Sequence, residues 1–348
     1  MTRALILGGT GMIGRAIARR LLAAGWSVEL TGRDPARMPR DVTAAGGRFV
    51  AADYHEAGQL KAAYGDGADL LVDCLCYTAD DARRVLPFLS GTRSSVMLSS
   101  KAVYVDAAGR NPNSDQAPCF DGPVPETQPL MAPGYGDYNT REGYGACKVA
   151  AERVLLDGGA PVTVIRPSKV HGEGNARPRE WVFVKRVLDR RPAIFLAHRG
   201  TGVDHPTAAV NIAALVEAVA AQPGPRILNC ADPDAPDVLE MSRVIARHLG
   251  HQWEEVLVDD DSLGQTPWDA IPPMVLDMTA ANELGYVPAG NYASTVTAEI
   301  DWLAAAHRAG DPGRVLPAPD DPFFARFTGY AAEDRWLASR RPARPGQS

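Results

Sequence analysis

A tyrosine and a lysine four residues apart form the pair best suited to proton transfer, in the segment Tyr144-Gly145-Ala146-Cys147-Lys148. On a helix, this spacing places both side chains on one face. A lysine ammonium beside a phenol lowers the pKa of the phenol, which can then exchange a proton with a substrate oxygen near neutral pH. The chain has only five lysines against 31 arginines, so each retained lysine is informative. The pair predicts an acid–base site, and a surface helix without chemistry is the alternative.

The segment GGTGMIG at residues 8–14 follows an apolar run and precedes a helical pattern. Its G-x-x-G-x-x-G spacing allows a tight turn, close approach of the backbone to a pyrophosphate, and close packing of the helix on the sheet. The N-terminus of that helix adds amide donors and a positive dipole. A glycine turn without a ligand is the alternative, but the strand–turn–helix context favours dinucleotide binding.

The second predicted strand ends in VELTGR at residues 28–33, where the adenosine ribose would lie. Enzymes that use NAD usually place a carboxylate there, whereas NADP needs that carboxylate absent and an arginine nearby. Because Arg33 stands at this end, we expect NADP(H) to be favoured over NAD(H), although Asp34 follows directly. Asp53 ends the third predicted strand and could accept from the adenine amino group; capping its own loop is the alternative.

Hydroxyl groups follow two further apolar runs. Ser99 and Ser100 come directly after the run 95–98, and Ser168 follows Arg166 and Pro167 at the end of the run 162–165. In doubly wound folds, ligands bind at the carboxyl ends of the parallel strands. These hydroxyls are therefore expected beside the substrate or the cofactor.

Six motifs occur in a fixed order over residues 3–305: GGTGMIG, Asp53 after the third strand, LSSKAVY, YGACK, RPSKVHG, and ELGYVP followed by a helix ending IDWL. In these motifs and their order, the chain resembles an extended short-chain dehydrogenase/reductase of the NAD(P)-dependent epimerase/dehydratase family. The resemblance implies that Tyr144 is the general acid/base. Lys148 would bind the nicotinamide ribose and depress the pKa of Tyr144, and Ser100, or Ser99 one position away, would hydrogen-bond the reacting oxygen.

The resemblance also implies that Pro167 and Ser168 line the nicotinamide. The whole set of expected cofactor contacts is Gly8, Thr10, Gly11, Met12, Ile13, Gly14, Arg33, Asp53, Tyr54, Cys74, Leu75, Cys76, Ser99, Tyr144, Lys148, Pro167 and Ser168.

Three departures from the family pattern bear on the substrate. Lys169 stands where sugar-nucleotide enzymes commonly carry asparagine, and Lys101-Ala102 replace the Asp-Glu pair that dehydratases use to move protons. The interval from Ser100 to Tyr144, 44 residues, is longer than is common in the group.

These features favour an NADP-dependent oxidoreductase that transfers hydride between nicotinamide and a ketone or secondary alcohol of a small, sugar-like or secondary-metabolite substrate. A sugar or sugar-nucleotide epimerase or dehydratase with tightly held NAD(P) is the alternative. A second alternative is a non-catalytic nucleotide- or RNA-associated protein. Residues 180–186 are similar to the same segment in a branch of this family whose plant chloroplast members associate with RNA. Those members tend to lose the catalytic tyrosine, which this chain keeps as Tyr144.

Apolar runs alternate with helical patterns through the first half, which predicts βαβ units with right-handed crossovers. We expect an α/β fold, a Rossmann-type doubly wound parallel sheet with a smaller, discontinuous C-terminal substrate domain. The dinucleotide-binding domain would span residues 1–172 plus about 205–230. The substrate domain and packed tail would span 173–204 and 231–337, with 338–348 disordered. Strands are expected at 4–7, 27–30, 48–51, 70–75, 95–98 and 162–165, and strand signals thin out from about residue 173.

Residues 105–142 are rich in Gly, Pro, Asn and Asp, and are expected to form a lid over the substrate. His205 could contact substrate or cap the following turn. His171 is more typical of a hydrogen-bonded interior position, and Trp181 of a core position. The run Asp259-Asp260-Asp261 is typical of a solvated turn.

Composition narrows the partners. The net charge is -6, the sequence pI is about 5.7, and no basic stripe is visible, so we expect a small-molecule substrate and no nucleic acid. The five cysteines lack metal-ligand spacing, and no metal is expected. The chain begins with an apolar strand, so we expect no signal peptide. It has no run of roughly 18 apolar residues, so we expect no membrane contact and a cytoplasmic location. A homodimer is the candidate assembly.

Overall fold

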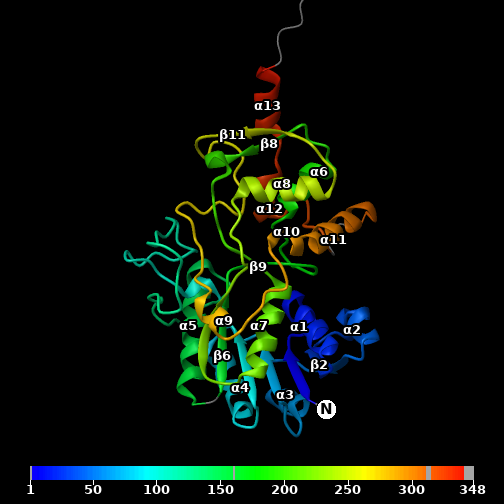
Figure 1. Ribbon diagram of the computed structural model, residues 1–348, viewed down its shortest axis with the longest axis vertical. Coiled ribbons are helices and arrows are strands. Elements are labelled where there is room, and N and C mark those ends of the chain that lie inside the picture. Colours follow the sequence, from blue (N-terminus) through cyan, green and yellow to red (C-terminus); the bar gives the residue numbers. More distant parts are fainter. Residues whose placement is uncertain (1, 160, 311–314, 341–348) are drawn as a thin grey trace, which may run out of the picture. The chain divides into compact units, whose positions relative to one another are not determined.

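A computed structural model describes residues 2–159, 161–310 and 315–340 (Figure 1). The chain divides into two units. Unit 1 comprises residues 1–175, 204–235 and 272–296, and unit 2 comprises 176–203, 236–271 and 297–348. The division differs from the predicted one mainly at residues 272–296. This segment was expected in the substrate domain, but it packs with unit 1 because Val124 pairs with Leu276 and Asp204 pairs with Met274.

A parallel sheet of seven strands in the order β10-β6-β5-β4-β1-β2-β3 forms the centre of unit 1 and confirms the predicted fold class (Figure 1). Its strands are β1 Arg3–Leu7, β2 Ser27–Gly32, β3 Arg48–Ala51, β4 Leu70–Asp73, β5 Ser94–Leu98, β6 Val162–Pro167 and β10 Arg226–Cys230. β10 was not among the strands predicted from the sequence. This short strand, RILNC, carries an arginine and an asparagine, yet it pairs along β6 at the sheet edge.

Helices cover both faces of the sheet. Successive residues of a strand point to opposite faces, so Ala4 and Ile6 pack in one core cluster while Leu5 and Leu7 pack in another. The first cluster includes residues of α1 (Met12–Ala23) and α7 (Ala209–Ala221). The second includes residues of α3 (Ala57–Tyr64), α4 (Ala79–Leu89) and α5 (Arg141–Asp157).

The strand order places a topological switch point between β1 and β4, which are neighbours in the sheet. The chain leaves β1 towards β2 on one side and leaves β4 towards β5 on the other. Connections that diverge in this way leave a crevice at the carboxyl ends of the strands, which is where ligands bind in open α/β sheets.

Local sequence fixes the two helices that border this crevice. A capping box begins α4, because the Thr78 hydroxyl accepts from the Asp81 amide while the Asp81 carboxylate accepts from the Thr78 amide. At α5, the Thr140 side chain accepts from the Gly143 amide at 2.9 Å. These caps set where each helix starts and therefore which residues face the crevice.

Unit 2 is built from helices and a two-stranded sheet. Its elements are α6 (Trp181–Leu188), β8 (Ala193–Leu196), α8 (Val238–His248), β11 (Glu254–Leu257), α11 (Thr297–Arg308), α12 (Pro322–Thr328) and α13 (Ala331–Ser339), and β8 pairs with β11. The tail packs as expected: Phe324 and Phe327 are buried, and Arg186 pairs with Glu333 at 2.7 Å. The predicted disorder from 338 is wrong for residues 338–340, since α13 runs to Ser339 and Arg340 contacts Glu254; residues 341–348 lie outside the described part.

Smaller elements complete the described chain. They are α2 (Arg40–Ala44), α9 (Thr279–Glu283), α10 (Tyr292–Thr295), the 3₁₀ turns η1 (Pro35–Arg37), η2 (Lys101–Val103) and η3 (Ala197–Gly200), and the paired strands β7 (Lys169–His171) and β9 (Pro206–Ala208).

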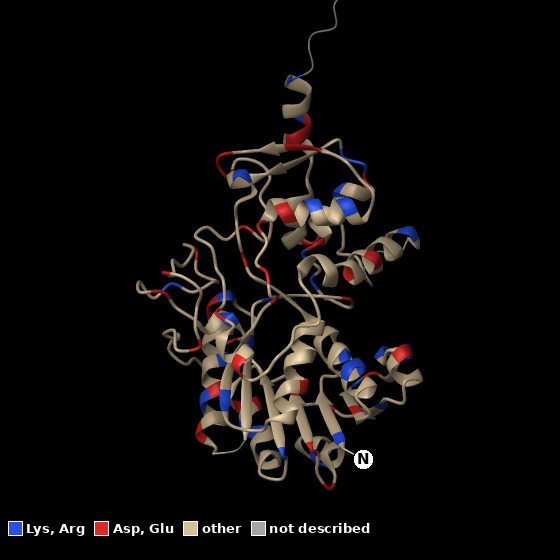
Figure 2. Cartoon of the chain, viewed as in Figure 1, with Lys and Arg blue, Asp and Glu red and all other residues tan. Residues whose placement is uncertain are grey.

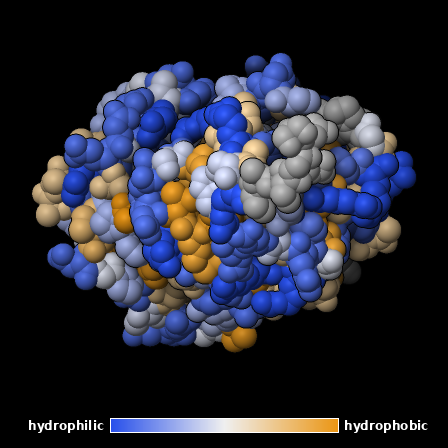
Figure 3. All heavy atoms as spheres, turned by 90° about the horizontal axis from the view of Figure 1, so that it is seen from above, coloured by the Kyte–Doolittle hydropathy of each residue, from blue (hydrophilic) through white to orange (hydrophobic). Residues whose placement is uncertain are grey.

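The described surface mixes charges of both signs. Figure 2 shows Lys and Arg interspersed with Asp and Glu along the elements. Figure 3 shows one face on which hydrophilic residues predominate around a smaller hydrophobic patch. Within the described residues, no helix is both long and apolar enough to span a membrane.

Candidate active site

The glycine loop between β1 and α1 leaves room for a ligand. Gly8 has a positive φ of 74°, and a Cβ on Gly14 would come within 2.6 Å of the Gly9 Cα, so both positions require glycine. Gly11 is the N-cap of α1, and no side chain in the described chain caps this helix end. A Cβ on Gly11 would meet only the Gly8 carbonyl oxygen, at 3.7 Å. The loop therefore fits a pyrophosphate.

The predicted ribose end of β2 carries no carboxylate. The strand ends at Gly32, and Arg33 is exposed directly after it. Asp34 caps the next turn, because its carboxylate accepts from the Ala36 amide at 2.9 Å. Asp53 likewise accepts from the His55 amide at 2.9 Å, so its loop-capping contact is present, and its contact with adenine stays a prediction.

The end of β4 holds a buried acid that the sequence analysis did not single out. Asp73 accepts from the Tyr54 hydroxyl at 2.7 Å and from the Leu75 amide at 2.8 Å. Burial raises the pKa of Asp73 to about 6, while these hydrogen bonds and the Lys148 ammonium pull it back down. Tyr54 is 5% exposed, and its contact with the cofactor stays a prediction.

Lys148 joins the carboxyl ends of two neighbouring strands. Its Nζ donates to the Cys76 carbonyl beyond β4 and to the Leu98 carbonyl at the end of β5, both at 2.8 Å. The side chain is buried, and Nζ lies 5.9 Å from the centre of the Tyr144 ring. The structure thus brings the two predicted acid–base residues together at the crevice.

Close packing of α5 on η2 brings Gly145, the neighbour of Tyr144, against the turn that Ser100 caps. A Cβ on Gly145 would come within 2.4 Å of the Ala102 carbonyl oxygen and 2.6 Å of the Met131 sulfur, so only glycine allows this approach. Ser100 caps η2, with its hydroxyl accepting from the Ala102 amide at 3.1 Å.

The two candidate serines have different surroundings. Ser99 is buried and donates to the Glu152 carboxylate, which also pairs with Arg166 at 2.5 Å. Arg166 in turn donates to the Tyr104 hydroxyl at 3.2 Å, and burial raises the pKa of Tyr104 to about 12. Because the Ser99 hydroxyl is committed to this interior network, Ser100 is the better candidate for contact with substrate.

Ser168, at the end of β6, is buried next to Pro167. Its amide donates to the Cys230 carbonyl at 3.0 Å and to the Thr207 hydroxyl at 3.1 Å. Its own hydroxyl has no partner within the described part of the chain. Buried hydroxyls are normally hydrogen-bonded, so this group fits a polar ligand group such as the nicotinamide amide. Together with the open loop at Gly11, it shows that the residues present suit a dinucleotide.

Residues 4–231 match the model of the NAD dependent epimerase/dehydratase family. The chain belongs to this family. The resemblance inferred from the motifs is therefore confirmed. Among curated protein sequences, none matches the chain significantly.

Solved structures of the same fold cover most of the chain. A putative epimerase from Burkholderia cenocepacia is 22% identical with a TM-score of 0.68, covering 88% of this chain and 99% of its own. The dTDP-glucose 4,6-dehydratase of Bacillus anthracis, in complex with NAD, is 14% identical with a TM-score of 0.66, covering 88% and 98%. The UDP-glucose 4-epimerase of Thermus thermophilus, in complex with NAD, is 17% identical with a TM-score of 0.65, covering 88% and 100%.

The lysines that depart from the family pattern share one carboxylate. Asp204 contacts Lys101 through one oxygen and Lys169 through the other, the latter at 2.5 Å. The neighbouring His205 has a structural role, since its Nδ1 accepts from the Leu276 amide and its Nε2 donates to the Asp232 carbonyl. Burial lowers the pKa of His205. The sequence predicted that His205 would contact substrate or cap the following turn. The structure instead shows its ring hydrogen-bonded to the backbone of Leu276 and Asp232.

The middle of the predicted lid is held in the protein core. Val124 is 1% exposed, Tyr104 pairs with Leu130, and the Met131 amide donates to the Val103 carbonyl at 2.8 Å. Residues 123–131 are thus anchored to the packed structure, because the backbone of Val124, Leu130 and Met131 is paired and the Val124 side chain is buried. Only the flanking residues 107–122 and 132–140 remain as candidates for a lid.

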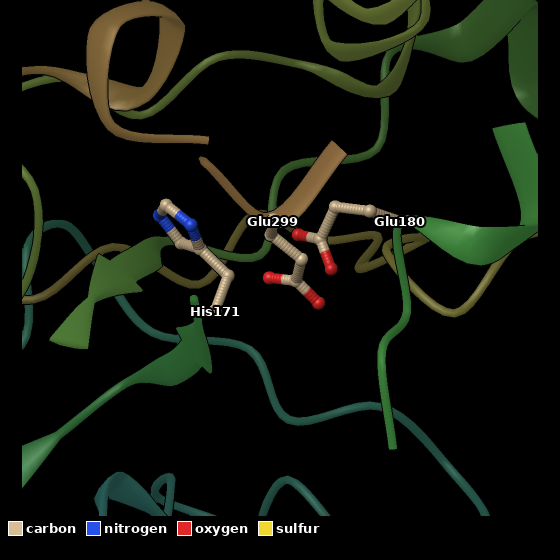
Figure 4. A group of neighbouring side chains, drawn as sticks. All are labelled: His171, Glu180 and Glu299. Atoms are coloured by element: carbon tan, nitrogen blue, oxygen red, sulfur yellow. The ribbon is translucent and has the colours of Figure 1, made fainter. Parts of the chain in front are cut away.

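Two buried glutamates were not among the site residues predicted from the sequence. Glu180 precedes α6 and Glu299 lies in α11, both in unit 2, and their carboxylate oxygens come within 4.8 Å of each other. Figure 4 draws them with His171 of unit 1, whose Nε2 lies 2.9 Å from Asp232. No local pattern marks either glutamate, because they are more than 100 residues apart in the chain.

Proposed function

We propose that this chain transfers hydride at a carbinol carbon of a sugar or sugar-like substrate and returns it to the same substrate, as an epimerase does. The observation that carries the proposal is the position of Lys148, whose Nζ donates to carbonyls at the carboxyl ends of β4 and β5 and lies 5.9 Å from the centre of the Tyr144 ring. Ser100, which caps η2, supports it because α5 packs on that turn. Membership of the family and the likeness to sugar-nucleotide epimerases support this reaction over simple reduction.

The residues of the chain handle the proton and the charge. Tyr144 Oη takes the proton from the carbinol oxygen as hydride leaves the carbon, and gives it back when hydride returns. The Ser100 hydroxyl donates to the same oxygen, and the Lys148 ammonium stabilises negative charge on the Tyr144 oxygen. When bound, nicotinamide would supply the hydride acceptor and donor. Gly8, Gly11 and the amides of the first turn of α1 would hold its pyrophosphate, and Ser168 its amide end.

Dehydration is a weaker proposal because of the residues after Ser100. Lys101 and Ala102 stand where dehydratases of this family carry an Asp-Glu pair, and neither is a carboxylate that could remove a proton from carbon. Lys101 is also engaged with Asp204.

A second candidate is an NADP-dependent reductase, and the end of β2 favours it. Gly32 leaves no carboxylate for a ribose hydroxyl, while the exposed Arg33 could pair with a 2′-phosphate. A reductase releases its nucleotide after each turnover, whereas an epimerase keeps it.

One experiment separates the two candidates. The purified protein is denatured, and any released nucleotide is identified by mass and absorbance; the native protein is then supplied with nucleotide-linked sugars and with small ketones. Substrate conversion with no net change in the absorbance of reduced nicotinamide supports the epimerase. Stoichiometric consumption of NADPH supports the reductase, and failure to bind either nucleotide contradicts both.

A further inference from the structure

Tyr77, which follows the end of β4, contacts the ammonium group of the acid–base site. The Lys148 Nζ lies 4.2 Å from the centre of the Tyr77 ring, closer than its 5.9 Å to the Tyr144 ring. The Tyr77 and Tyr138 rings stack with centres 4.8 Å apart and planes 12° apart. Tyr138 belongs to the segment 132–140 that precedes α5, so this segment reaches the acid–base lysine through one intervening ring.

The backbone around Tyr77 is fixed by two independent sets of hydrogen bonds. The Tyr77 amide donates to the Asp81 carboxylate at 3.1 Å, as part of the capped start of α4. The preceding residue, Cys76, accepts from the Lys148 Nζ at 2.8 Å. The ring is therefore attached at a defined distance from the ammonium that it contacts.

An aromatic face attracts an ammonium group, and the attraction is stronger where water is excluded. Lys148 is 2% exposed, so this contact is made away from solvent. The lysine side chain has four methylene groups and many rotamers. Two carbonyl acceptors and one aromatic face together restrict the ammonium to a single position beside Tyr144.

We propose that Tyr77 is a positioning residue for the acid–base pair: its ring holds the Lys148 ammonium beside Tyr144, and Tyr138 holds the ring. The role in catalysis rests on the proposed function of Tyr144 and Lys148, whereas the contact itself does not. Loss of the ring lets the ammonium sample other positions and weakens its stabilisation of the Tyr144 oxygen.

The contact is tested first in the cofactor-free protein. Because the chain has only five lysines, a sample labelled with ¹³C at lysine Cε gives few signals, and a Lys148→Met variant identifies the signal of Lys148. A ring over the ammonium shields the ε-methylene group. We expect Tyr77→Leu to shift the Lys148 signal downfield, and Tyr77→Phe, which keeps the aromatic face, to leave it near the wild-type position. An unchanged signal in Tyr77→Leu overturns the proposal.

Kinetics then test the positioning role. Tyr77→Leu should lower kcat about tenfold, the size expected for loss of a desolvated cation–π contact. Tyr77→Phe should restore most of it, and Tyr138→Leu should lower kcat in the same direction. Val287→Ala is the control, because Val287 is 73% exposed and lies outside the segment 132–140.

The outcomes separate the two proposals. If the Lys148 signal shifts but kcat of Tyr77→Leu equals that of the wild type, the positioning role is wrong while the proposed function stands. If Tyr77→Phe loses as much activity as Tyr77→Leu, the hydroxyl rather than the aromatic face matters, which also overturns the proposal. If the wild type transfers no hydride, the proposed function fails, and the signal shift still decides whether Tyr77 holds the ammonium. Tyr138→Leu supplies the same readouts should Tyr77→Leu not fold.

Discussion

At the residue scale, the proposed chemistry depends most directly on the Tyr144 hydroxyl. Tyr144→Phe removes one oxygen and keeps the ring beside Lys148, so the helix and the glycine loop are unaffected. We expect nucleotide binding to persist while turnover falls by roughly 10²–10⁴, the usual worth of a general acid/base. Calorimetry measures binding and a substrate assay measures turnover. Normal turnover in the Phe variant would exclude Tyr144 from the proton transfer.

Arg33 carries the nucleotide choice of the second candidate, the proposed NADP-dependent reductase. It is exposed after a strand end that carries no carboxylate. Arg33→Ala should weaken NADPH binding by about tenfold to a hundredfold, since a hydrogen bond to a charged group contributes roughly 1.5–3 kcal/mol. NADH binding should hardly change. Titrating both nucleotides against both proteins measures this, and equal wild-type affinities would remove the NADP preference.

At the scale of elements, the contact between α5 and η2 places the acid–base helix. Gly145→Ala adds a Cβ 2.4 Å from the Ala102 carbonyl oxygen, and the helix must shift to accommodate it. Overpacking of this kind costs about 1–3 kcal/mol, and we expect kcat to fall more than nucleotide affinity. Urea unfolding and kinetics measure the two effects. Glu142→Ala, an exposed change one turn earlier, is the control that should leave both unchanged.

The flanks of the long connection before α5 are the elements that a ligand would order. Tyr135 is 76% exposed in residues 132–140, whereas Val124 and Leu130 in residues 123–131 are paired with other segments. Chymotrypsin should therefore cut first at Tyr135, and the cut should slow when nucleotide and substrate are both present. Cleavage at the same rate under saturation would mean that this segment does not close over the site.

At the scale of the whole molecule, titration of Asp73 makes the free energy of unfolding depend on pH. Its folded pKa of about 6 lies above the unfolded value of 3.8, so between these pH values the folded state holds more protons. The free energy of unfolding therefore falls as pH rises through this window, and the loss is complete above it. Asp73→Asn removes this titration. The stability of the variant relative to wild type should rise from pH 4 to pH 7 by up to about 3 kcal/mol, at 1.36 kcal/mol per pKa unit.

Urea unfolding of the two proteins at several pH values measures this difference. Effects of other titrating groups cancel because both proteins contain them. The asparagine oxygen can still accept from the Leu75 amide, so any constant offset is separate from the pH-dependent part. A difference that stays flat from pH 4 to pH 7 would show that Asp73 titrates normally.

The sequence by itself determined the local features of this protein. The strand–turn–helix at residues 3–23, six of the sheet strands and the Tyr144–Lys148 spacing depend on hydrophobic period, glycine and capping, all of which involve residues close in the chain. The order of the family motifs depends on the sequence alone, and it identified the family before any contact was known.

Only the tertiary structure decided which distant residues meet. Lys148 reaches carbonyls 72 and 50 residues away, and Asp204 reaches Lys101 across 103 residues. The contact of Tyr77 with Lys148 and the pairing of β10 with β6 likewise depend on strand order and helix packing. Non-local contacts of this kind follow from how the sheet assembles, and no short segment of the sequence encodes them.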